Sequence, residues 1–246
     1  MSERPYDLVV FDWDGTIFDT TALIAEGIRF TARELGLPVP SFEAASTVIG
    51  LGWQDALRRA VPDLACEDYP KFGEIFRRWY IPNEARVTLF PGTRRLIEGL
   101  HAEGVQLAVA TGKSRPGLDR VLEQTGLGTY FVTTRTPDEC RPKPNPDMLE
   151  EIGIETGIEA ARTVMIGDTT HDLFMARDYR CDGIAMLQGA QSAEELAPAP
   201  AVARCRNTVE LAAALGFPGL VTPEMLEAER AAREEKEAVV RQSGVE

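Results

Sequence analysis

The hydrophobic pattern of this chain alternates between two kinds of segment. In one kind, apolar and β-branched residues follow one another without interruption, which is typical of strands buried on both faces of a parallel sheet. In the other kind, apolar residues recur every three or four positions, as they do on one face of a helix. The uninterrupted runs predict five main strands, at residues 8–11, 105–110, 130–134, 163–166 and 183–187.

Helical segments separate these strands, and this order predicts βαβ units with right-handed crossovers. We therefore expect an α/β fold with a Rossmann-like parallel sheet core. Its five main strands are expected in the order 3-2-1-4-5.

One long stretch departs from the alternation. Between residues 18 and 86 no convincing strand occurs, and apolar residues recur at helical spacing up to a helix that we expect to end at Pro82. A block of this length exceeds an ordinary connection between a strand and a helix, so it predicts an inserted helical domain. The expected division of the chain is 1–17 and 87–222 for the α/β core, 18–86 for the helical insert, and 223–246 for a charged helical tail that is dispensable for catalysis.

Polar side chains follow the ends of several predicted strands. In open α/β sheets, ligands bind beyond the carboxyl ends of the strands, so we expect these side chains to converge. Converging carboxylates suit a hard cation such as Mg²⁺, and an ammonium beside a hydroxyl suits a phosphoryl group. The groups in question are Asp12 and Asp14, Thr111 next to Gly112, Lys143 in a proline-bounded loop, and Asp168 with Asp172.

Composition and charge limit the classes of binding partner that the protein is expected to have. The 246 residues carry a formal net charge of -13, which argues against a nucleic-acid partner and requires local positive charge for phosphate chemistry. No apolar run is long enough for a membrane span, and the first predicted strand begins too early to leave room for a secretory signal. Four scattered cysteines favour free thiols, and so we expect a cytoplasmic protein, either a monomer or a homodimer.

Four segments together resemble the signature motifs of the haloacid dehalogenase (HAD) superfamily, in the order that the superfamily shows. An insert directly after the first motif is similar to the C1 cap of that superfamily. Within it, the chain most resembles phosphoglycolate-phosphatase-like enzymes. The segments are Asp12-Trp13-Asp14-Gly15-Thr16, Thr111-Gly112-Lys113, Lys143, and Gly167-Asp168-Thr169-Thr170-His171-Asp172.

The resemblance implies a role for each motif residue. Asp12 is the expected nucleophile, which forms an aspartyl-phosphate, and Asp14 is the expected general acid and later the base that activates water. The carboxylate of Asp12 and the backbone carbonyl of Asp14 are expected to hold Mg²⁺. The further expected assignments are Asp168 as a metal ligand, Asp172 in a supporting role at the metal, and Thr111, Gly112 and Lys143 around the transferring phosphoryl group.

The resemblance also implies a Mg²⁺-dependent phosphomonoesterase for a small soluble ester, with 2-phosphoglycolate as the best single guess. Three alternatives share the motifs: a sugar-phosphate phosphatase, a phosphomutase, and a nucleoside monophosphate phosphatase. A remote alternative is a receiver-like module that is phosphorylated on Asp without turnover. The length, the helical insert and the Asp-x-Asp spacing all argue against that module.

The roles of some residues in the insert and near it stay open. Lys113 could touch a substrate, but a lysine at a strand–helix junction is more often solvated. The loop Gly50-Leu51-Gly52-Trp53 could face a substrate or form a plain turn with a packed tryptophan. Candidates for a substrate-carboxylate clamp are Arg29, Arg33, Arg58 and Arg59, although solvated helix faces explain arginines more often.

Overall fold

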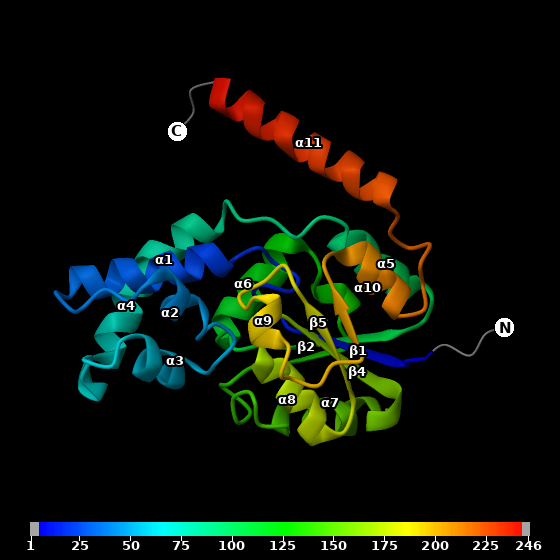
Figure 1. Ribbon diagram of the computed structural model, residues 1–246, viewed down its shortest axis with the longest axis horizontal. Coiled ribbons are helices and arrows are strands. Elements are labelled where there is room, and N and C mark those ends of the chain that lie inside the picture. Colours follow the sequence, from blue (N-terminus) through cyan, green and yellow to red (C-terminus); the bar gives the residue numbers. More distant parts are fainter. Residues whose placement is uncertain (1–4, 243–246) are drawn as a thin grey trace.

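A computed structural model describes residues 5–242, with side chains described up to residue 234, and contains a six-stranded parallel sheet (Figure 1). Adjacent strands pair in the order β3-β2-β1-β4-β5-β6. Residues 1–4 and 243–246, which the sequence assigned to the α/β core and to the tail, lie outside the described part. The strands are β1 Leu8–Phe11, β2 Gln106–Ala110, β3 Thr133–Arg135, β4 Thr163–Gly167, β5 Asp182–Met186 and β6 Ala203–Cys205.

The α/β fold and the order of its five main strands are confirmed, and a sixth strand extends the sheet. β6 pairs in parallel with β5, in a region for which no strand was predicted. It is three residues long and carries Arg204 at its centre, so it has no apolar run that a sequence pattern could reveal. The expected third strand at 130–134 begins later, because residues Gly128–Tyr130 form a 3₁₀ turn.

Helices cover both faces of the sheet, which explains the uninterrupted apolar runs. One face packs against α5 (Thr93–Ala102), α6 (Arg115–Thr125) and α10 (Thr208–Ala214). The opposite face packs against α7 (Asp147–Thr156) and α8 (Thr170–Tyr179). Successive strand residues point to alternate faces, and every residue of the central strands β1 and β4 is therefore buried under one helical layer or the other.

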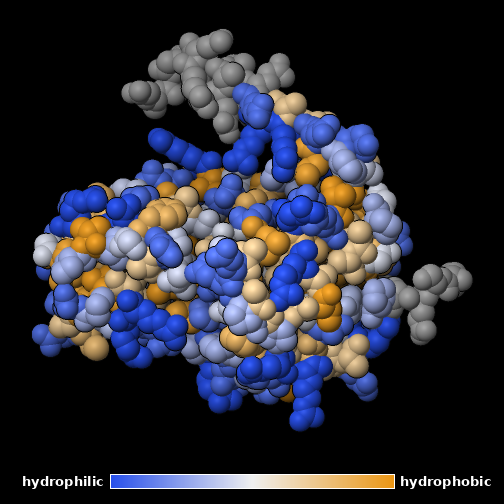
Figure 2. Space-filling model, viewed as in Figure 1, coloured by the Kyte–Doolittle hydropathy of each residue, from blue (hydrophilic) through white to orange (hydrophobic). Residues whose placement is uncertain are grey.

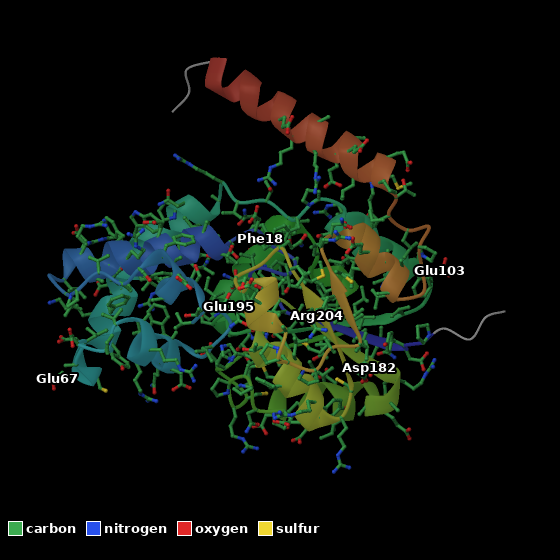
Figure 3. All side chains as sticks on the ribbon, viewed as in Figure 1. Phe18, Glu67, Glu103, Asp182, Glu195 and Arg204 are labelled. Carbon is green, nitrogen blue, oxygen red and sulfur yellow. The ribbon has the colours of Figure 1, made fainter. Side chains whose placement is uncertain are left out.

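The residues between β1 and α5 form four helices with a separate apolar core, seen in Figure 1 beside the sheet. This helical group is called the cap below. Phe18, labelled in Figure 3, packs with the core of the α/β body, close to where the chain leaves that body for α1. The cap helices are α1 Thr21–Glu34, α2 Phe42–Ser46, α3 Trp53–Ala60 and α4 Tyr69–Glu84.

Helix α4 continues through Pro82, so the expectation that it ends there is wrong. Proline has no N–H to donate to the carbonyl one turn earlier. The carbonyl concerned is that of Arg78; the neighbouring carbonyl of Trp79 accepts a hydrogen bond from the side-chain amide of Asn83 at 2.7 Å, which adds a bond in the last turns. The helix therefore reaches Glu84, and this extra length brings a carboxylate to the boundary between the cap and the α/β body.

The surface is mixed in character. Figure 2 shows hydrophilic residues over much of one face, with hydrophobic residues scattered among them. None of the helices within residues 5–242 combines the length and the apolar composition that crossing a bilayer requires.

The charged helix α11 (Pro223–Gln242) is anchored at its start. Leu226 is buried in the main core cluster, and the carboxylate of Glu229 accepts a hydrogen bond from the backbone N–H of Gly92 at 2.9 Å. A Cβ on Gly92 would meet both Val221 and Leu226, so the chain approaches closely at this point. The first turns of α11 thus cover the start of α5.

We expect Leu226→Ala to lower the free energy of unfolding by about 2 to 3 kcal/mol, because it removes a buried side chain from a packed core. Met225→Ala is the matched control: Met225 is 37% exposed and its loss should change stability by less than about 0.5 kcal/mol. Urea titrations of the three proteins make the comparison. A chain ending at Thr222 should melt at a lower temperature yet keep its activity, and an inactive folded truncation would contradict this.

Candidate active site

The carboxyl end of β1 places the first two acids. The backbone N–H of Asp12 still pairs with the carbonyl of Ile166 in β4 at 2.8 Å, so the sheet fixes the position of Asp12. Gly15 then turns the chain with φ +86°, a conformation that a residue with a Cβ rarely adopts. A Cβ on Gly15 would also collide with the carboxylate of Asp168, so the same glycine leaves room for that acid.

Three buried carboxylates converge beyond β1 and β4: Asp12, Asp168 and Asp172. One oxygen of each lies within 4.8 Å of the others, and all three residues are at most 1% exposed. Asp168 accepts hydrogen bonds from Thr16 Oγ1 at 2.9 Å and from the backbone N–H of Ala190 at 2.7 Å. The expected convergence of these three acids is therefore present in the geometry.

Lys143 is buried among these acids. Its Nζ lies 2.6 Å from Asp172 Oδ1 and 2.9 Å from Asp12 Oδ1. Asp12 Oδ1 therefore pairs with this ammonium, whereas Asp12 Oδ2 is buried without a hydrogen-bond partner. Burial alone would lower the pKa of Lys143, but Asp12 and Asp172 outweigh it, and the pKa is raised. Lys143 is thus a permanently charged ammonium.

Asp172 has little free capacity for a further ligand. Its Oδ2 accepts from both the backbone N–H and the hydroxyl of Thr169, at 3.1 and 2.7 Å, and its Oδ1 accepts from Lys143. These bonds fix Asp172 at the first turn of α8. The arrangement suits a supporting role at a metal site better than direct coordination.

The electrostatics of this cluster are unbalanced, because three carboxylates face one ammonium. Burial raises the pKa of Asp12 to about 7, against the lowering effect of Lys143, and Asp172 and Asp14 add to the rise. Burial, followed by the charges of Asp12 and Asp172, also raises the pKa of Asp168 well above its ordinary value. A divalent cation would supply the missing positive charge.

The donor set fits such a cation. Hard divalent ions prefer carboxylate and carbonyl oxygens, and Asp12 offers the buried Oδ2, which no hydrogen bond occupies. Two glycines leave room for the Asp168 carboxylate: a Cβ on Gly189, like one on Gly15, would collide with Asp168. The side-chain carboxylate of Asp14 is not part of this cluster. The expected role of the Asp14 backbone carbonyl as a metal ligand stays a prediction.

The carboxylate of Asp14 has a separate set of partners. Its Oδ1 accepts from the hydroxyl of Thr20 at 2.6 Å and lies 3.2 Å from Nζ of Lys113. The Lys113 side chain is only 8% exposed, so the expectation of a solvated lysine is wrong. Lys113 also donates to Glu84 at 3.0 Å, and its ammonium lies 5.3 Å from the centre of the Tyr80 ring.

Glu84 joins the cap to the α/β body, and the sequence pattern did not reveal it. Its carboxylate is 1% exposed and accepts from Lys113 and from Arg120 on α6, whose Nε lies 3.1 Å away. Burial would raise the pKa of Glu84, but the two cations lower it overall. The sequence feature that could have identified Glu84 is its spacing from Phe76 and Tyr80. These three residues recur every four positions on one helix face, but only if α4 continues through Pro82.

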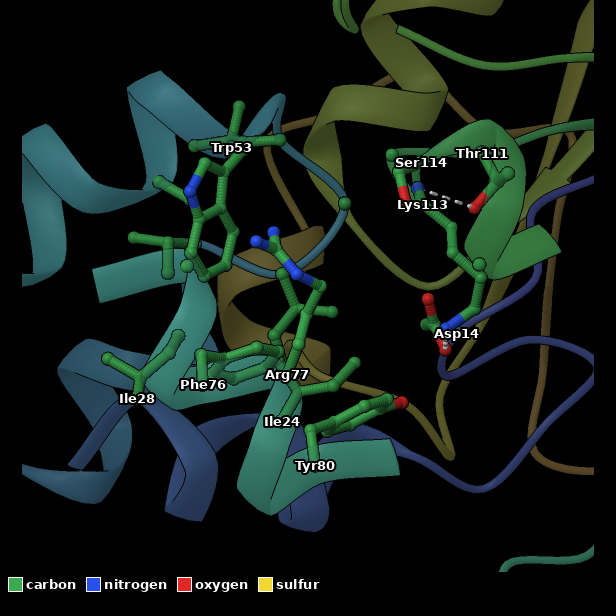
Figure 4. A pocket seen from close by; sticks show the side chains of 18 of the residues that line it. Asp14, Ile24, Ile28, Trp53, Phe76, Arg77, Tyr80, Thr111, Lys113 and Ser114 are labelled. Atoms are coloured by element: carbon green, nitrogen blue, oxygen red, sulfur yellow. Dashed lines mark hydrogen bonds and ion pairs between the residues drawn. The ribbon is translucent and has the colours of Figure 1, made fainter. Parts of the chain in front are cut away.

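A cavity of about 370 Å³ lies between the cap and the end of the sheet, with Asp12 and Asp14 in its wall (Figure 4). Thr111 lines it from β2, and the hydroxyl of Thr111 accepts from the backbone N–H of Lys113 at 3.2 Å. Gly112 also lines it, and a Cβ there would lie 2.6 Å from the carbonyl oxygen of Gly50. The cap loop therefore rests on the phosphate-binding turn that was expected at Thr111 and Gly112.

Both interpretations of the cap loop hold in part. Gly50, Leu51 and Trp53 line the cavity, while Trp53 also packs against Phe72 and Phe76. The four arginines considered as a carboxylate clamp do not line it. Two of them have local partners, since Arg29 pairs with Glu26 and Arg58 with Asp55. The arginines in the described wall of the cavity are Arg77 and Arg120.

Comparisons with known proteins give the class. The model of the family described as haloacid dehalogenase-like hydrolase matches residues 9–186. A protein of Dickeya dadantii named "Probable phosphatase IndB" is 33% identical over 196 residues, covering 77% of this chain and 84% of its own length. A phosphoglycolate phosphatase of Vibrio parahaemolyticus is 27% identical, covering 80% of this chain and 90% of its own.

Solved structures share the fold. A predicted phosphoglycolate phosphatase from Haemophilus somnus has a TM-score of 0.77 at 22% identity, over 85% of this chain and 98% of that one. This chain belongs to the haloacid dehalogenase-like hydrolases. Within that family it is a phosphatase, similar to phosphoglycolate phosphatases.

We expect Glu84→Gln to lower the free energy of unfolding by about 3 kcal/mol at neutral pH, because it leaves two cations without their shared buried carboxylate. The lowered pKa of Glu84 means that its stabilising effect is complete above the ordinary carboxyl value of 4.5 and is lost as the pH falls below it. The difference between the two proteins should therefore shrink in acid. Glu74→Gln, on the exposed side of α4, is the control, and an equal effect of both changes would contradict this account.

Proposed function

We propose that this phosphatase is a Mg²⁺-dependent phosphomonoesterase that acts through phosphorylation of Asp12. One observation carries the proposal: Asp12 lies in the wall of the cavity, its Oδ1 pairs with the Lys143 ammonium, and its buried Oδ2 accepts no hydrogen bond. A carboxylate in that state is available to a cation through one oxygen and to a phosphorus atom through the other.

In the first step, an oxygen of Asp12 forms a bond to phosphorus while the bond from phosphorus to the alcohol oxygen breaks. Asp14 gives its proton to that leaving oxygen, so the alcohol departs neutral. Lys143 and the hydroxyl of Thr111 hold the equatorial phosphoryl oxygens. Thr20 and Lys113 position the carboxyl group of Asp14 for the transfer.

In the second step, Asp14 takes a proton from a water molecule whose oxygen attacks the phosphorus of the aspartyl-phosphate. The bond from Asp12 to phosphorus breaks, which returns the Asp12 carboxylate and releases inorganic phosphate. The closed cap excludes other water from the cavity, so the water that Asp14 activates is the one that reacts.

Asp12, the backbone carbonyl of Asp14, and Asp168 would hold Mg²⁺, with Asp172 in support. When bound, the ion neutralises part of the charge on the phosphoryl oxygens and so reduces their repulsion of the Asp12 carboxylate. Thr16, Ala190 and Thr169 keep the two later acids in place through the hydrogen bonds described above.

Within this class, the names of several relatives make 2-phosphoglycolate the first ester to test. A sugar-phosphate phosphatase, a nucleoside monophosphate phosphatase and a phosphomutase use the same groups, and the product separates the mutase, which gives an isomeric phosphate instead of free phosphate. A receiver-like module would keep a stable phosphorylated Asp12, whereas Asp14 provides the base for its hydrolysis. Four free cysteines support a cytoplasmic location.

We expect removal of divalent cations by EDTA to abolish phosphate release, and Mg²⁺ to restore it. Mg²⁺ should also raise the Tm of the wild-type protein, since it binds the folded state and relieves repulsion among buried carboxylates. Asp168→Asn should weaken that rise. Full activity after exhaustive EDTA treatment would refute the metal requirement.

Lys143→Ala should reduce kcat/KM by about a hundredfold or more, which corresponds to a loss of roughly 3 kcal/mol of transition-state stabilisation. Lys143→Met keeps most of the buried volume and serves if the alanine variant is unstable. Lys71→Ala, at an exposed cap lysine, is the control. Near-normal kinetics of a folded Lys143 variant would show that the phosphoryl group binds elsewhere.

A further inference from the structure

The cations in the wall of the cavity differ in how their charge is balanced. Three of them line it: Arg77, Lys113 and Arg120. Lys113 pairs with Asp14 and Glu84, and Arg120 pairs with Glu84. Among the residues that the structure describes, Arg77 has no ion pair, although the chain carries a net charge of -13. An unpaired guanidinium in a cavity wall is a place where an anion of a ligand can bind.

A second donor lies beside Arg77. An ideal Cβ on Gly73 would be 3.1 Å from Arg77 Nη1 and 3.5 Å from Trp53 Nε1, so the two nitrogens approach the same point. The indole N–H of Trp53, like Arg77, has no acceptor among the described side chains and backbone. The glycine leaves that point open, and Gly73 itself lines the cavity. Two free N–H donors therefore converge on one space.

The wall around these donors is apolar. Ile24 and Ile28 from α1 line the cavity together with Phe76 and Tyr80 from α4, and the two rings stack at 5.1 Å with an angle of 15° (Figure 4). The cavity volume of about 370 Å³ is far larger than one bound water molecule needs. An ester with an aromatic ring would cover more of that apolar wall than a two-carbon ester such as 2-phosphoglycolate.

Resting on the proposed phosphatase function, we propose that Trp53 Nε1 and the Arg77 guanidinium form a carboxylate-binding subsite that selects the substrate. The substrate class is a phosphate monoester of an aromatic alcohol that carries a carboxylate away from the phosphate. Its phosphoryl group binds at Asp12, its ring lies against Phe76, Tyr80 and the isoleucines of α1, and its carboxylate accepts from the two donors. The arginine supplies a planar pair of N–H groups that matches a carboxylate.

The test compares 4-carboxyphenyl phosphate with 4-carbamoylphenyl phosphate, which has the same shape and no charge. The quantity compared is the ratio of kcat/KM for the first ester to kcat/KM for the second. In the Arg77→Ala enzyme this ratio is expected to be about tenfold lower than in the wild-type enzyme, because one charge-assisted hydrogen bond at a partly exposed site is lost. Trp53→Phe keeps a ring and removes the N–H, so it should lower the ratio about threefold. Arg78→Ala, the neighbouring arginine outside the cavity wall, is the control and should leave the ratio unchanged.

A ratio that is the same in the wild-type and Arg77→Ala enzymes would refute the subsite while leaving the phosphatase function intact. A higher kcat/KM for 2-phosphoglycolate than for 4-carboxyphenyl phosphate would refute the aromatic substrate class.

Binding of the two matching phosphonates, which cannot be hydrolysed, separates the two proposals. Calorimetry should show tighter binding of 4-carboxyphenylphosphonate, lost on Arg77→Ala. If no ester releases phosphate but this preference is seen, the proposed function fails and the subsite stands. If neither is seen, both fail.

Discussion

The contact of Lys143 with Asp12 and Asp172 is the constraint on which the rest of the site depends. Three carboxylates with almost no exposure to water would repel one another strongly, and a single ammonium compensates only part of their charge. The surrounding features all serve to hold this unbalanced group: two parallel strands that end side by side, glycines that leave space for Asp168, and α8, whose first turn fixes Asp172. This unbalanced negative charge is what the proposed Mg²⁺ would compensate.

A second set of buried charges connects the cap to this centre. Glu84 at the end of α4 holds Lys113 and Arg120, and Lys113 in turn contacts Asp14. The position of the expected general acid is therefore coupled to the seating of the cap. The cap also provides most of the cavity wall, including Trp53 and Arg77 of the proposed carboxylate subsite.

The sequence was informative where one local pattern determines one structure. Uninterrupted apolar runs revealed four of the five main strands and lay just before the polar β3, and the acids at strand ends revealed the cluster of Asp12, Asp168 and Asp172. It was uninformative where two distant segments meet. Lys113 is buried only because Glu84 reaches it from the cap, and the helix that carries Glu84 continues past a proline that normally ends a helix. Arg77 likewise gains its significance from Trp53 on another helix, and β6 from its pairing with β5.

The central claim is that the phosphoryl group is transferred twice, first to Asp12 and then to water. The most direct test is the configuration at phosphorus after hydrolysis of an isotopically labelled chiral ester. Each in-line displacement inverts the configuration, so two displacements predict overall retention. Inversion would show direct attack by water on the ester and would contradict the role assigned to Asp12.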